Sequence, residues 1–463
     1  MTQIVQLPLW LFILIVLFAA VTALSHFLIP SVRWFFRRRF ERAVARLNTR
    51  LTRPIEPFKL AQRHDMIQRL IYDPEVTREI VNYAQENGVP ENVAFQKAQE
   101  YAREIVPGFS AFAYFSFAMR IARLLANAVY RIKTSDKNDD ILAGIPQEST
   151  VVFIMNHRSN MDYVLVTYLA SRATTMSYAV GEWARVWPLS MMIKLWGAYF
   201  IRRKSRGALY RKVLARYVHM ATHAGVTQAI FPEGGLSVTG ALQPPKMGLL
   251  AYVVEAYEAD SSRDLVFVPV AINYDRVLED RVLIAAGKRG DRRFGARISV
   301  VVFAFFKKFW QRVRGKDTRF GSAAVAFGTP LSLADAQMTD VDALSTALID
   351  RISDVMPILA VPLIATVLLR DQRVEVSEMV ENARALMEQA PPQNRTSENE
   401  DLGAEVQRGL IGLKRRDIIE LDHGYWQIKA GGEDVLAFYA RSVAHLLPEN
   451  AAVAKVLSAT AKS

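Results

Sequence analysis

Residues 141–330 alternate short runs of β-forming residues with stretches of helical character, and this alternation constrains the fold more than any other feature. Helical stretches lie between the β-rich runs, as at Arg206–Ala224 and Met247–Tyr257. Strands that alternate with helices favour an α/β domain with helices packed on a sheet. The strand candidates are Thr150–Met155, Gln228–Phe231, Leu265–Asn273, Arg297–Phe305 and Ala323–Phe327.

A long apolar segment opens the chain. Residues 1–32 contain no Asp, Glu, Lys or Arg, and Leu7–Ile29 would measure roughly 34 Å as a helix, enough to cross a bilayer. A secretory signal peptide is the alternative, with Val21-Thr22-Ala23 as a weak cleavage site. Such peptides usually open with a basic stretch, which MTQIVQ lacks. We therefore expect an N-terminal transmembrane helix that anchors the protein.

The positive charge of the chain is concentrated beside this segment. Lys and Arg exceed Asp and Glu by 12, and Arg33–Arg50 contains seven arginines and one glutamate. Arginines after an apolar span predict that the bulk of the chain lies on the cytoplasmic side of the membrane, with the cluster against anionic lipids. The charge then requires no nucleic-acid partner. The absence of cysteine excludes disulfides and thiolate nucleophiles.

The composition changes along the chain predict four parts. The polar stretch Lys133–Asp140 (KTSDKNDD) marks one boundary. Ahead of it, Phe109–Tyr130 is apolar and is either a core helix or a helix at the membrane interface. The parts are the membrane anchor at 1–32, a basic juxtamembrane and helical region at 33–135, the α/β domain at 136–330 and a C-terminal helical region at 331–463.

A histidine and an aspartate interrupt the apolar stretch FIMNHRSNMDYVLV at Phe153–Val166. His157 and Asp162 are five positions apart, which would place their side chains roughly 140° apart on a continuous helix. They can meet if His157 lies in a loop and Asp162 in the first turn of the next helix. Asp162 would then accept the Nδ1 proton of His157 and leave Nε2 as a base. A purely structural histidine is the alternative.

Two further segments place polar residues at the ends of apolar runs. GAYFIRR ends in Arg202 and Arg203, and paired guanidinium groups suit a phosphate, although a solvated strand end would look the same. FPEGG places Glu233 after a strand, where sites of α/β proteins commonly lie, and its glycines permit a tight turn. The stretch Gly235–Thr239 approaches a serine nucleophile elbow, but it lacks the final glycine.

The strand VFVPVAINYDR contains Pro269, which has no N–H for a ladder. We expect an edge strand or a bulge there, either as a plain edge or as the wall of an apolar pocket. The sequence contains no phosphate-binding P-loop, no dinucleotide fingerprint and no metal-ligand cluster. We therefore expect no metal and no cofactor.

The segments NHRSNMD, GAYFIRR, FPEGG and VPVAINYDR follow one another within one α/β domain. Together they resemble the four blocks of the glycerolipid acyltransferase superfamily. FIRR, the PPK at Pro244–Lys246 and YARSVAHLL at Tyr439–Leu447 are similar to its bacterial membrane-bound glycerol-3-phosphate acyltransferase branch. The resemblance covers roughly residues 105–450 and implies a mixed sheet flanked by helices, with helical N- and C-terminal regions.

The resemblance implies a role for each motif residue. His157 matches the catalytic base and Asp162 its partner, while Arg202 falls in the block that binds the acceptor phosphate. Glu233 and Gly234 match the block that helps form the acceptor site. The implied substrate-binding residues are Arg158, Ser159, Arg202, Arg203, Glu233, Gly234, Ser237, Lys246 and Pro269, the last on the acyl side.

The chain departs from the family pattern at two positions. The third block usually carries an arginine before the serine, where this chain has Leu236, and the first block often has a second histidine where Asn160 stands. The missing arginine removes one phosphate contact. Arg203, Lys204 or Lys246 can replace it, or its loss indicates a different acceptor or reduced activity.

The resemblance implies acyl transfer from a thioester of coenzyme A or acyl carrier protein to the hydroxyl of glycerol-3-phosphate, giving lysophosphatidate. The oxyanion would be stabilised by backbone N–H groups near Gly234 or in the 157–162 loop. The alternatives are a lysophosphatidate acyltransferase and a catalytically weak lipid-binding membrane protein. Phe305–Lys316 (FFKKFWQRVRGK) is either a headgroup contact or an exposed basic loop.

Overall fold

The computed structural model describes residues 8–18, 38–39, 42, 44–49, 51–134, 138–170, 175–181, 189–202, 207–257, 263–290, 319–338, 340–396 and 402–447. The chain forms two compact units, Met1–Pro54 and Ile55–Ser463. In the first unit residues 9–18 are helical and expose large apolar side chains, including Trp10 and Phe18. None of the helices within the described ranges has the length and apolarity to cross a membrane. Most of the predicted anchor Leu7–Ile29 and of the cluster Arg33–Arg50 lies outside these ranges.

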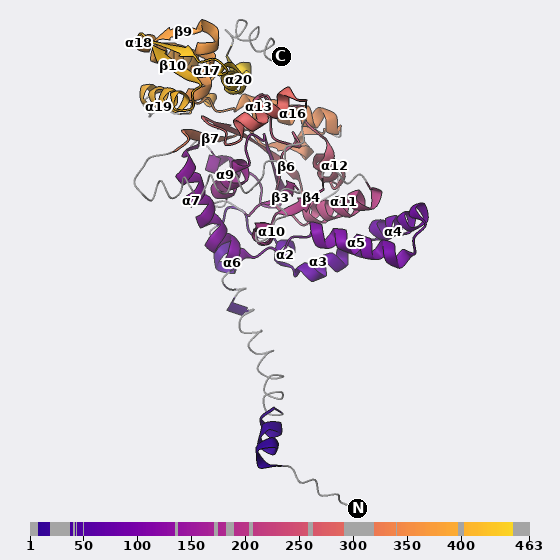
Figure 1. The fold of residues 1–463 in the computed structure, drawn as a ribbon. Coiled ribbons are helices and arrows are strands. Elements are labelled where there is room, and N and C mark those ends of the chain that lie inside the picture. The colour runs from indigo at the N-terminus through magenta and orange to yellow at the C-terminus, as the bar shows by residue number, and fades with distance from the viewer. Residues whose placement is uncertain are drawn as a thin grey trace, which may run out of the picture. The chain divides into compact units, whose positions relative to one another are not determined.

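The second unit is built on a mixed sheet of eight described strands, in the order β1-β7-β6-β2-β5-β3-β4, with β8 paired to β6. Figure 1 labels β3, β4, β6 and β7 of this sheet among the surrounding helices. Neighbours from β6 to β4 run parallel, whereas β7 and β8 are antiparallel to β6. Its strands are β1 (Arg131–Thr134), β2 (Thr150–Met155), β3 (Ser177–Gly181), β4 (Tyr199–Ile201), β5 (Gln228–Ile230), β6 (Leu265–Tyr274), β7 (Ser322–Phe327) and β8 (Leu331–Ser332). A three-stranded antiparallel sheet comprises β9 (Arg373–Glu375), β10 (Ile419–Asp422) and β11 (Tyr425–Ile428).

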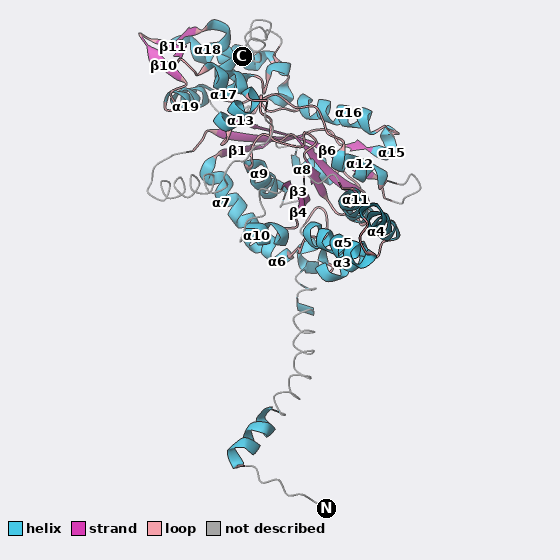
Figure 2. Ribbon diagram, turned by 45° about the vertical axis from the view of Figure 1, so that its right-hand side comes forward, coloured by secondary structure: helices cyan, strands magenta, loops and turns pink. Residues whose placement is uncertain are grey.

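Strand β2 shows how the main sheet separates two hydrophobic cores. Phe153 and Met155 belong to one cluster of buried side chains, and Val152 and Ile154 to the other. Successive side chains of a strand point to opposite faces, so a strand covered on both faces is apolar throughout. The unbroken run TVVFIM is therefore explained by helices on both sides of the sheet, as Figure 2 shows.

The helices divide between these two cores. Those contributing to the core with Phe153 are α7 (Met119–Val129), α8 (Asn138–Ala143), α9 (Met161–Ala170), α10 (Leu189–Leu195), α13 (Asp280–Lys288), α17 (Ala360–Asp371), α18 (Val376–Gln389), α19 (Leu402–Lys414) and α20 (Glu433–Ala440). Those contributing to the core with Ile154 are α3 (Arg63–Ile71), α4 (Pro74–Asn87), α5 (Glu91–Ile105), α11 (Ala208–His223), α12 (Gly248–Glu255), α15 (Leu333–Ala336) and α16 (Val341–Asp354). Short elements are α2 (Pro57–Leu60), α6 (Ala111–Ala113), the π-helical turn η1 (Tyr114–Ala118) and the 3₁₀ turns η3 (Pro392–Asn394) and η4 (Ala444–Leu446).

Four predicted strands are confirmed, because β2, β5, β6 and β7 match the predicted ranges to within one residue at each end. The predicted strand Arg297–Phe305 and the segment Phe305–Lys316 lie outside the described residues. Part of the predicted polar linker Lys133–Asp140 is strand, since β1 pairs with β7 in parallel. The four-part division of the chain remains a prediction.

The expectation that Pro269 marks an edge or a bulge is wrong. β6 is paired on both sides, and its register with β2 runs without a break through Ile154 and Pro269. On the other side the pairing with β8 ends at Phe267 and the pairing with β7 begins at Val270. The Pro269 carbonyl accepts a hydrogen bond from the Gly328 N–H on this side. The missing N–H therefore faces the gap between two ladders, where it leaves no partner unsatisfied.

The C-terminal helices pack closely on the α/β part of the unit. α17 is buried along nearly its whole length and contacts α18, α19 and α20. At Gly240, with φ of 88°, an added Cβ would come within 1.8 Å of the Phe438 carbonyl oxygen on α20. Only glycine permits this approach, which places the loop after FPEGG against the C-terminal region.

Candidate active site

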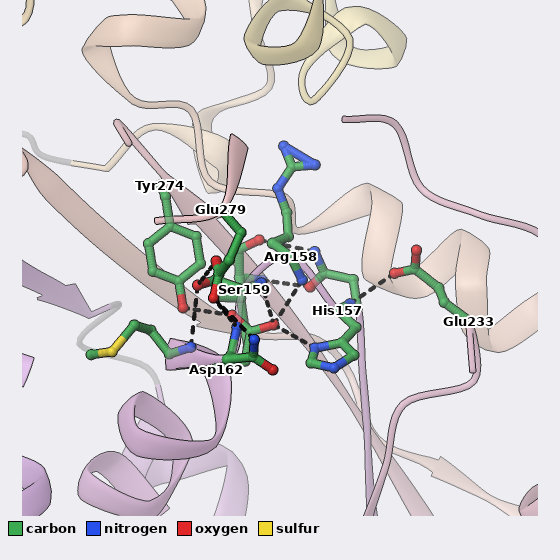
Figure 3. Close-up of polar contacts among 11 residues, drawn as sticks. His157, Arg158, Ser159, Asp162, Glu233, Tyr274 and Glu279 are labelled. Carbon is green, nitrogen blue, oxygen red and sulfur yellow. Dashed lines mark hydrogen bonds and ion pairs between the residues drawn. The ribbon is translucent and has the colours of Figure 1, made fainter. Parts of the chain in front are cut away.

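His157 and Asp162 are in contact, in the arrangement predicted from their spacing. β2 ends at Met155 and α9 begins at Met161, so His157 lies in the intervening loop and Asp162 in the first turn of the helix. His157 Nδ1 is 2.8 Å from Asp162 Oδ2, and both side chains are buried (Figure 3). An ionised carboxylate only accepts hydrogen bonds, so Nδ1 carries the proton and Nε2 carries the lone pair.

Donors from the loop and from β6 bind both carboxylate oxygens of Asp162. Oδ2 also accepts the backbone N–H of Arg158 at 2.7 Å and of Ser159 at 3.0 Å. Oδ1 accepts the hydroxyl of Tyr274, at the end of β6, at 2.6 Å. Bonds to charged acceptors are the strong ones, so this network fixes both the carboxylate and the loop that carries His157.

Two aromatic rings hold the imidazole from its sides. The His157 ring centroid is 4.3 Å from that of Phe231 and 5.4 Å from that of Tyr163, with the Tyr163 ring nearly perpendicular at 80°. Phe231 and Tyr163 also contact each other at 5.0 Å. Such contacts restrict rotation of the imidazole, so its orientation does not depend on the Asp162 hydrogen bond alone.

Glu233, in the motif FPEGG, forms a hydrogen bond with the backbone of His157, in the motif NHRSNMD. Its Oε1 accepts the His157 N–H at 2.8 Å, and its Oε2 accepts the Gln243 N–H at 3.1 Å. The His157 carbonyl in turn accepts the Ser237 N–H at 2.9 Å. Burial raises the pKa of Glu233 from 4.5 to about 8, against the opposing effect of the hydrogen bond from His157. Glu233 thus acts on the backbone of the base, and its side chain does not contact the imidazole nitrogens.

A second buried carboxylate supports the same loop. Glu279 accepts the Ser159 hydroxyl at 2.8 Å through Oε2, and the Asn160 N–H and side-chain amide at 3.3 and 3.1 Å through Oε1. Burial raises the pKa of Glu279. The side chain of Ser159 is therefore engaged within the protein, and we assign it to positioning the loop. Asn160, which stands in the place of a family histidine, has the same role.

Arg158 and Ser237 are likewise engaged internally. The Arg158 guanidinium donates to the Gly240 carbonyl and, at 3.2 Å, to Asn273 Oδ1, and it is only 2% exposed. Ser237 Oγ donates to the Ala241 carbonyl at 2.6 Å. Both side chains hold the turn and the loop in place. Their predicted part in substrate binding stays a prediction.

Arg202 directly follows β4 at the same carboxyl edge of the sheet. β4 is three strands from β2, or about 14 Å at the usual strand spacing. Its guanidinium forms a two-point ion pair with Glu104 on α5, with distances from 2.5 to 3.0 Å. Tyr101 and Tyr210 lie 5.3 and 5.9 Å from it. The structure does not show contact between Arg202 and the His157 cluster, and Arg203 and Lys204 lie outside the described residues.

Lys246 lies against the turn after β5, which contains Gly234 of the predicted acceptor site. Gly234 has φ of 65°, and an added Cβ there would lie 2.8 Å from Cδ of Lys246. The aliphatic part of Lys246 therefore crosses the glycine, and its ammonium group lies beside the turn. Leu236, which replaces the family arginine, instead packs against the hydrophobic core. Among the described residues, Lys246 thus places a positive charge beside Gly234, two residues before the position where the family has its arginine.

The expected oxyanion donors are already occupied. The N–H groups of residues 157–160 donate to Glu233, Asp162 and Glu279, and the Gly234 N–H donates to the Phe231 carbonyl at 3.1 Å. Within the described part of the chain, the N–H groups of Gly235 and Leu236 have no such acceptor. The same residues contain no cluster of His, Asp and Glu that could hold a metal ion.

Sequence reasoning missed Tyr274 and Glu279. Tyr274 belongs to the motif VPVAINYDR, and its position at the carboxyl end of a strand was the available signal. Glu279 lies 120 residues from Ser159 and has no local pattern around it. Both are recognisable only once the order of strands in the sheet is known.

Comparison with known proteins finds two family models that match this chain. The Acyltransferase family model matches residues 139–273, and the model of the glycerol-3-phosphate acyltransferase C-terminal region matches residues 306–463. Proteins named glycerol-3-phosphate acyltransferase from Pseudomonas entomophila (strain L48) and Pseudomonas fluorescens (strain SBW25) are each 30% identical, over 279 and 288 residues. These alignments cover 59% and 61% of this chain, which spans about a third (32% and 33%) of the length of these relatives.

A solved structure is also similar, that of the 1-acyl-sn-glycerophosphate (LPA) acyltransferase PlsC from Thermotoga maritima. It is 18% identical, with a TM-score of 0.32, and covers 51% of this chain and 74% of its own. The His157–Asp162 pair lies within residues 139–273, the region that matches the Acyltransferase family model. In the two matched regions the chain is similar to the Acyltransferase family and to glycerol-3-phosphate acyltransferases.

Proposed function

We propose that the protein transfers a fatty acyl group from an acyl thioester to the hydroxyl of glycerol-3-phosphate, giving lysophosphatidate for phospholipid synthesis. The observation that carries the proposal is the 2.8 Å contact between His157 Nδ1 and Asp162 Oδ2, which leaves Nε2 as a base at the carboxyl end of β2. The relatives named glycerol-3-phosphate acyltransferase and the match of the C-terminal region support the choice of acceptor.

The chemistry follows from the state of the imidazole. An alcohol is a weak nucleophile at neutral pH, so His157 Nε2 takes its proton as the oxygen attacks the thioester carbonyl. The tetrahedral intermediate collapses, the C–S bond breaks, and the proton passes from His157 to the leaving thiolate. The N–H groups of Gly235 and Leu236 are our candidates for the oxyanion donors, because the other donors of the loop and the turn are occupied.

The acceptor phosphate requires cations near the same edge of the sheet. We propose Lys246 and Arg202 for this role, with Gly234 permitting close approach of the substrate and Pro269 on the acyl side. Lys246 lies beside the turn after β5, in the region where the family has its arginine. Arg202 forms an ion pair with Glu104 and must exchange or share that partner to bind a phosphate.

We propose further that the protein works at the inner membrane, with its catalytic domain on the cytoplasmic side and anchored through its N-terminal segment. The exposed apolar side chains of residues 9–18 support this location. In the second unit, Phe112, Phe117 and Leu124 are 65, 56 and 53% exposed, and large exposed apolar patches mark lipid or protein contacts.

The deciding experiment uses the purified full-length protein with labelled glycerol-3-phosphate and an acyl-CoA, and His157→Ala as the control variant. Acid-stable lysophosphatidate formed by the wild type and absent with His157→Ala supports the proposal. Turnover with lysophosphatidate alone identifies acylation of the remaining hydroxyl instead. Lipid binding without turnover, unchanged by His157→Ala, identifies a lipid-binding protein. Replacing acyl-CoA with acylated carrier protein tests the donor.

A further inference from the structure

A cavity lined by arginines lies between the main sheet and α19, apart from the His157 cluster. Its volume is about 310 Å³, at the lower end of the range for ligand sites. Its wall combines the edge of the sheet, near β1 and β7, with one face of α19, which Figure 2 shows beside each other. The arginines that line it are Arg131, Arg276, Arg319, Arg408, Arg415 and Arg416. We call this cavity the arginine cleft.

The two carboxylates in the wall of the arginine cleft, Asp275 and Glu405, interact with groups other than its arginines. Asp275 accepts the N–H groups of Ser322 and Val361 at 2.7 and 3.0 Å, and burial raises its pKa. Glu405 forms a buried ion pair with Lys133. The closest approach of Arg408 to Glu405 is 3.9 Å, beyond hydrogen-bond distance. Arg416 already forms a buried ion pair with Asp280, which lies outside this wall. The wall of the arginine cleft still carries more guanidinium groups than carboxylates.

Arg276 shows the electrostatic consequence. Its guanidinium stacks on the Phe320 ring at 4.0 Å, and its Nε is buried without a hydrogen-bond partner among the described residues. Burial, and then the positive charge of Arg416, lower the pKa of Arg276. Clustered like charges in a partly buried site are destabilising unless an anion offsets them. Guanidinium forks match the oxygens of phosphate in particular.

The arginine cleft is also connected to the active-site loop. A second cavity shares Arg276, Arg415 and Arg416 with it and is lined by Glu279, which holds Ser159 and Asn160. Arg276 follows Tyr274 by two residues, and Tyr274 donates to Asp162. An anion bound by Arg276 would therefore lie beside a residue that is two positions from Tyr274 and three positions from Glu279, the two supports of the His157 loop.

From this geometry we infer that the arginine cleft is a second anion site that binds a phosphate-bearing ligand, either a small phosphorylated molecule or a phospholipid headgroup. The site is separate from the acceptor site proposed above and does not depend on that function. Ligand binding orders the end of β6, and through Tyr274 and Glu279 it stabilises the loop that carries His157.

The test measures pyrophosphate binding to the full-length protein in detergent by isothermal titration calorimetry, with Gly412→Glu as the central variant. Gly412 lines the cleft, and an added Cβ there meets nothing within 4 Å, so a side chain can start from this position without a clash at its Cβ. The added carboxylate should weaken pyrophosphate binding by about tenfold or more. Gly412→Ala, which changes the backbone propensity equally but adds no charge, should bind as the wild type does.

A second pair of variants separates local from general charge effects. Arg408→Gln combined with Arg415→Gln removes two exposed arginines of the cleft and should also weaken binding by about tenfold. Arg384→Gln removes an exposed arginine of α18 that does not line the cleft and should leave binding unchanged.

Two probes distinguish the ligand sources. Binding of pyrophosphate indicates a soluble phosphorylated ligand, whereas cleft-dependent binding of phosphatidate vesicles without pyrophosphate binding indicates a headgroup. Either result supports the site. Equal binding by Gly412→Glu and Gly412→Ala, or no binding of either probe by the wild type, overturns it. Pyrophosphate binding that is lost with Arg202→Gln but kept with Gly412→Glu would place the anion at the acceptor site and also overturns it.

Discussion

The Tyr274 hydroxyl donates a 2.6 Å hydrogen bond to Oδ1 of Asp162, a residue 112 positions earlier in the chain, while Oδ2 of the same carboxylate faces His157. The phenol and the imidazole thus hold opposite oxygens of one aspartate. The base is oriented by a carboxylate that is itself fixed by the end of β6, so the orientation of His157 depends on the assembled sheet.

Tyr274→Phe tests this relationship. The change leaves a buried carboxylate oxygen without its donor, so we expect the free energy of unfolding to fall by about 1–3 kcal/mol and kcat to fall about tenfold with little change in KM. Tyr130→Phe is a matched control, because its hydroxyl donates to the Arg276 carbonyl and its ring lies 5.1 Å from that of Tyr274. A kcat loss of equal size in both variants would show that only stability is at stake.

Asp162→Asn should reduce kcat by about 10²–10⁴-fold, since the amide removes the charge that stabilises a protonated His157 and offers one acceptor oxygen in place of two. The same loss weakens the bonds from the Arg158 and Ser159 N–H groups. Steady-state kinetics together with a denaturant titration separate the two effects. A folded variant with kcat within about threefold of the wild type would exclude Asp162 from orienting the base.

Glu233 predicts a particular dependence of stability on pH. Because burial raises its pKa to about 8, the folded protein binds a proton that the unfolded chain releases near 4.5. The contribution of Glu233 to stability is therefore fully present below pH 4.5 and is lost as the pH rises toward 8. Chemical denaturation from pH 4.5 to 8.5 should show a decline that Glu233→Gln flattens.

Glu75→Gln is the control for this pH series. The hydrogen bond from Lys212 lowers the pKa of Glu75, so this carboxylate has the opposite sign and stabilises the fold above its ordinary pKa. Its replacement should leave the decline between pH 4.5 and 8.5 in place. If Glu233→Gln and the wild type show parallel curves, Glu233 is not protonated in the folded protein at neutral pH.

Arg202→Gln should raise KM for glycerol-3-phosphate by about tenfold or more if its guanidinium binds the acceptor phosphate. The single change also leaves Glu104 nearly buried without its partner, which is destabilising. The double variant Glu104→Gln/Arg202→Gln removes that cost and should recover stability while KM stays high. Recovery of KM in the double variant would assign the ion pair a structural role only.

Leu236→Arg restores the arginine that the family usually has in the third block. Leu236 is partly exposed, so the longer side chain can extend toward solvent beside the turn. We expect a lower KM for glycerol-3-phosphate, by about threefold to tenfold, because one phosphate contact is added. Lys246→Gln should have the opposite effect in the wild type and a smaller effect in Leu236→Arg. An unchanged KM in Leu236→Arg would indicate that the phosphate lies elsewhere.

The sequence by itself determined the features that depend on near neighbours. The positions of β2, β5, β6 and β7 followed from apolar runs bounded by polar turns. The meeting of His157 and Asp162 required only a strand end and the start of a helix, both of which are encoded within ten residues. Such features are local because backbone periodicity and turn chemistry act over a few residues.

Only the tertiary structure decided which distant residues complete the site. Tyr274 and Glu279 reach the His157 loop because β6 lies beside β2, and Glu104 binds Arg202 because α5 packs near β4. Pro269 is tolerated within a paired strand because two ladders end on either side of it. These relationships depend on strand order and on packing between segments about 100 residues apart, and local sequence patterns carry no record of that order.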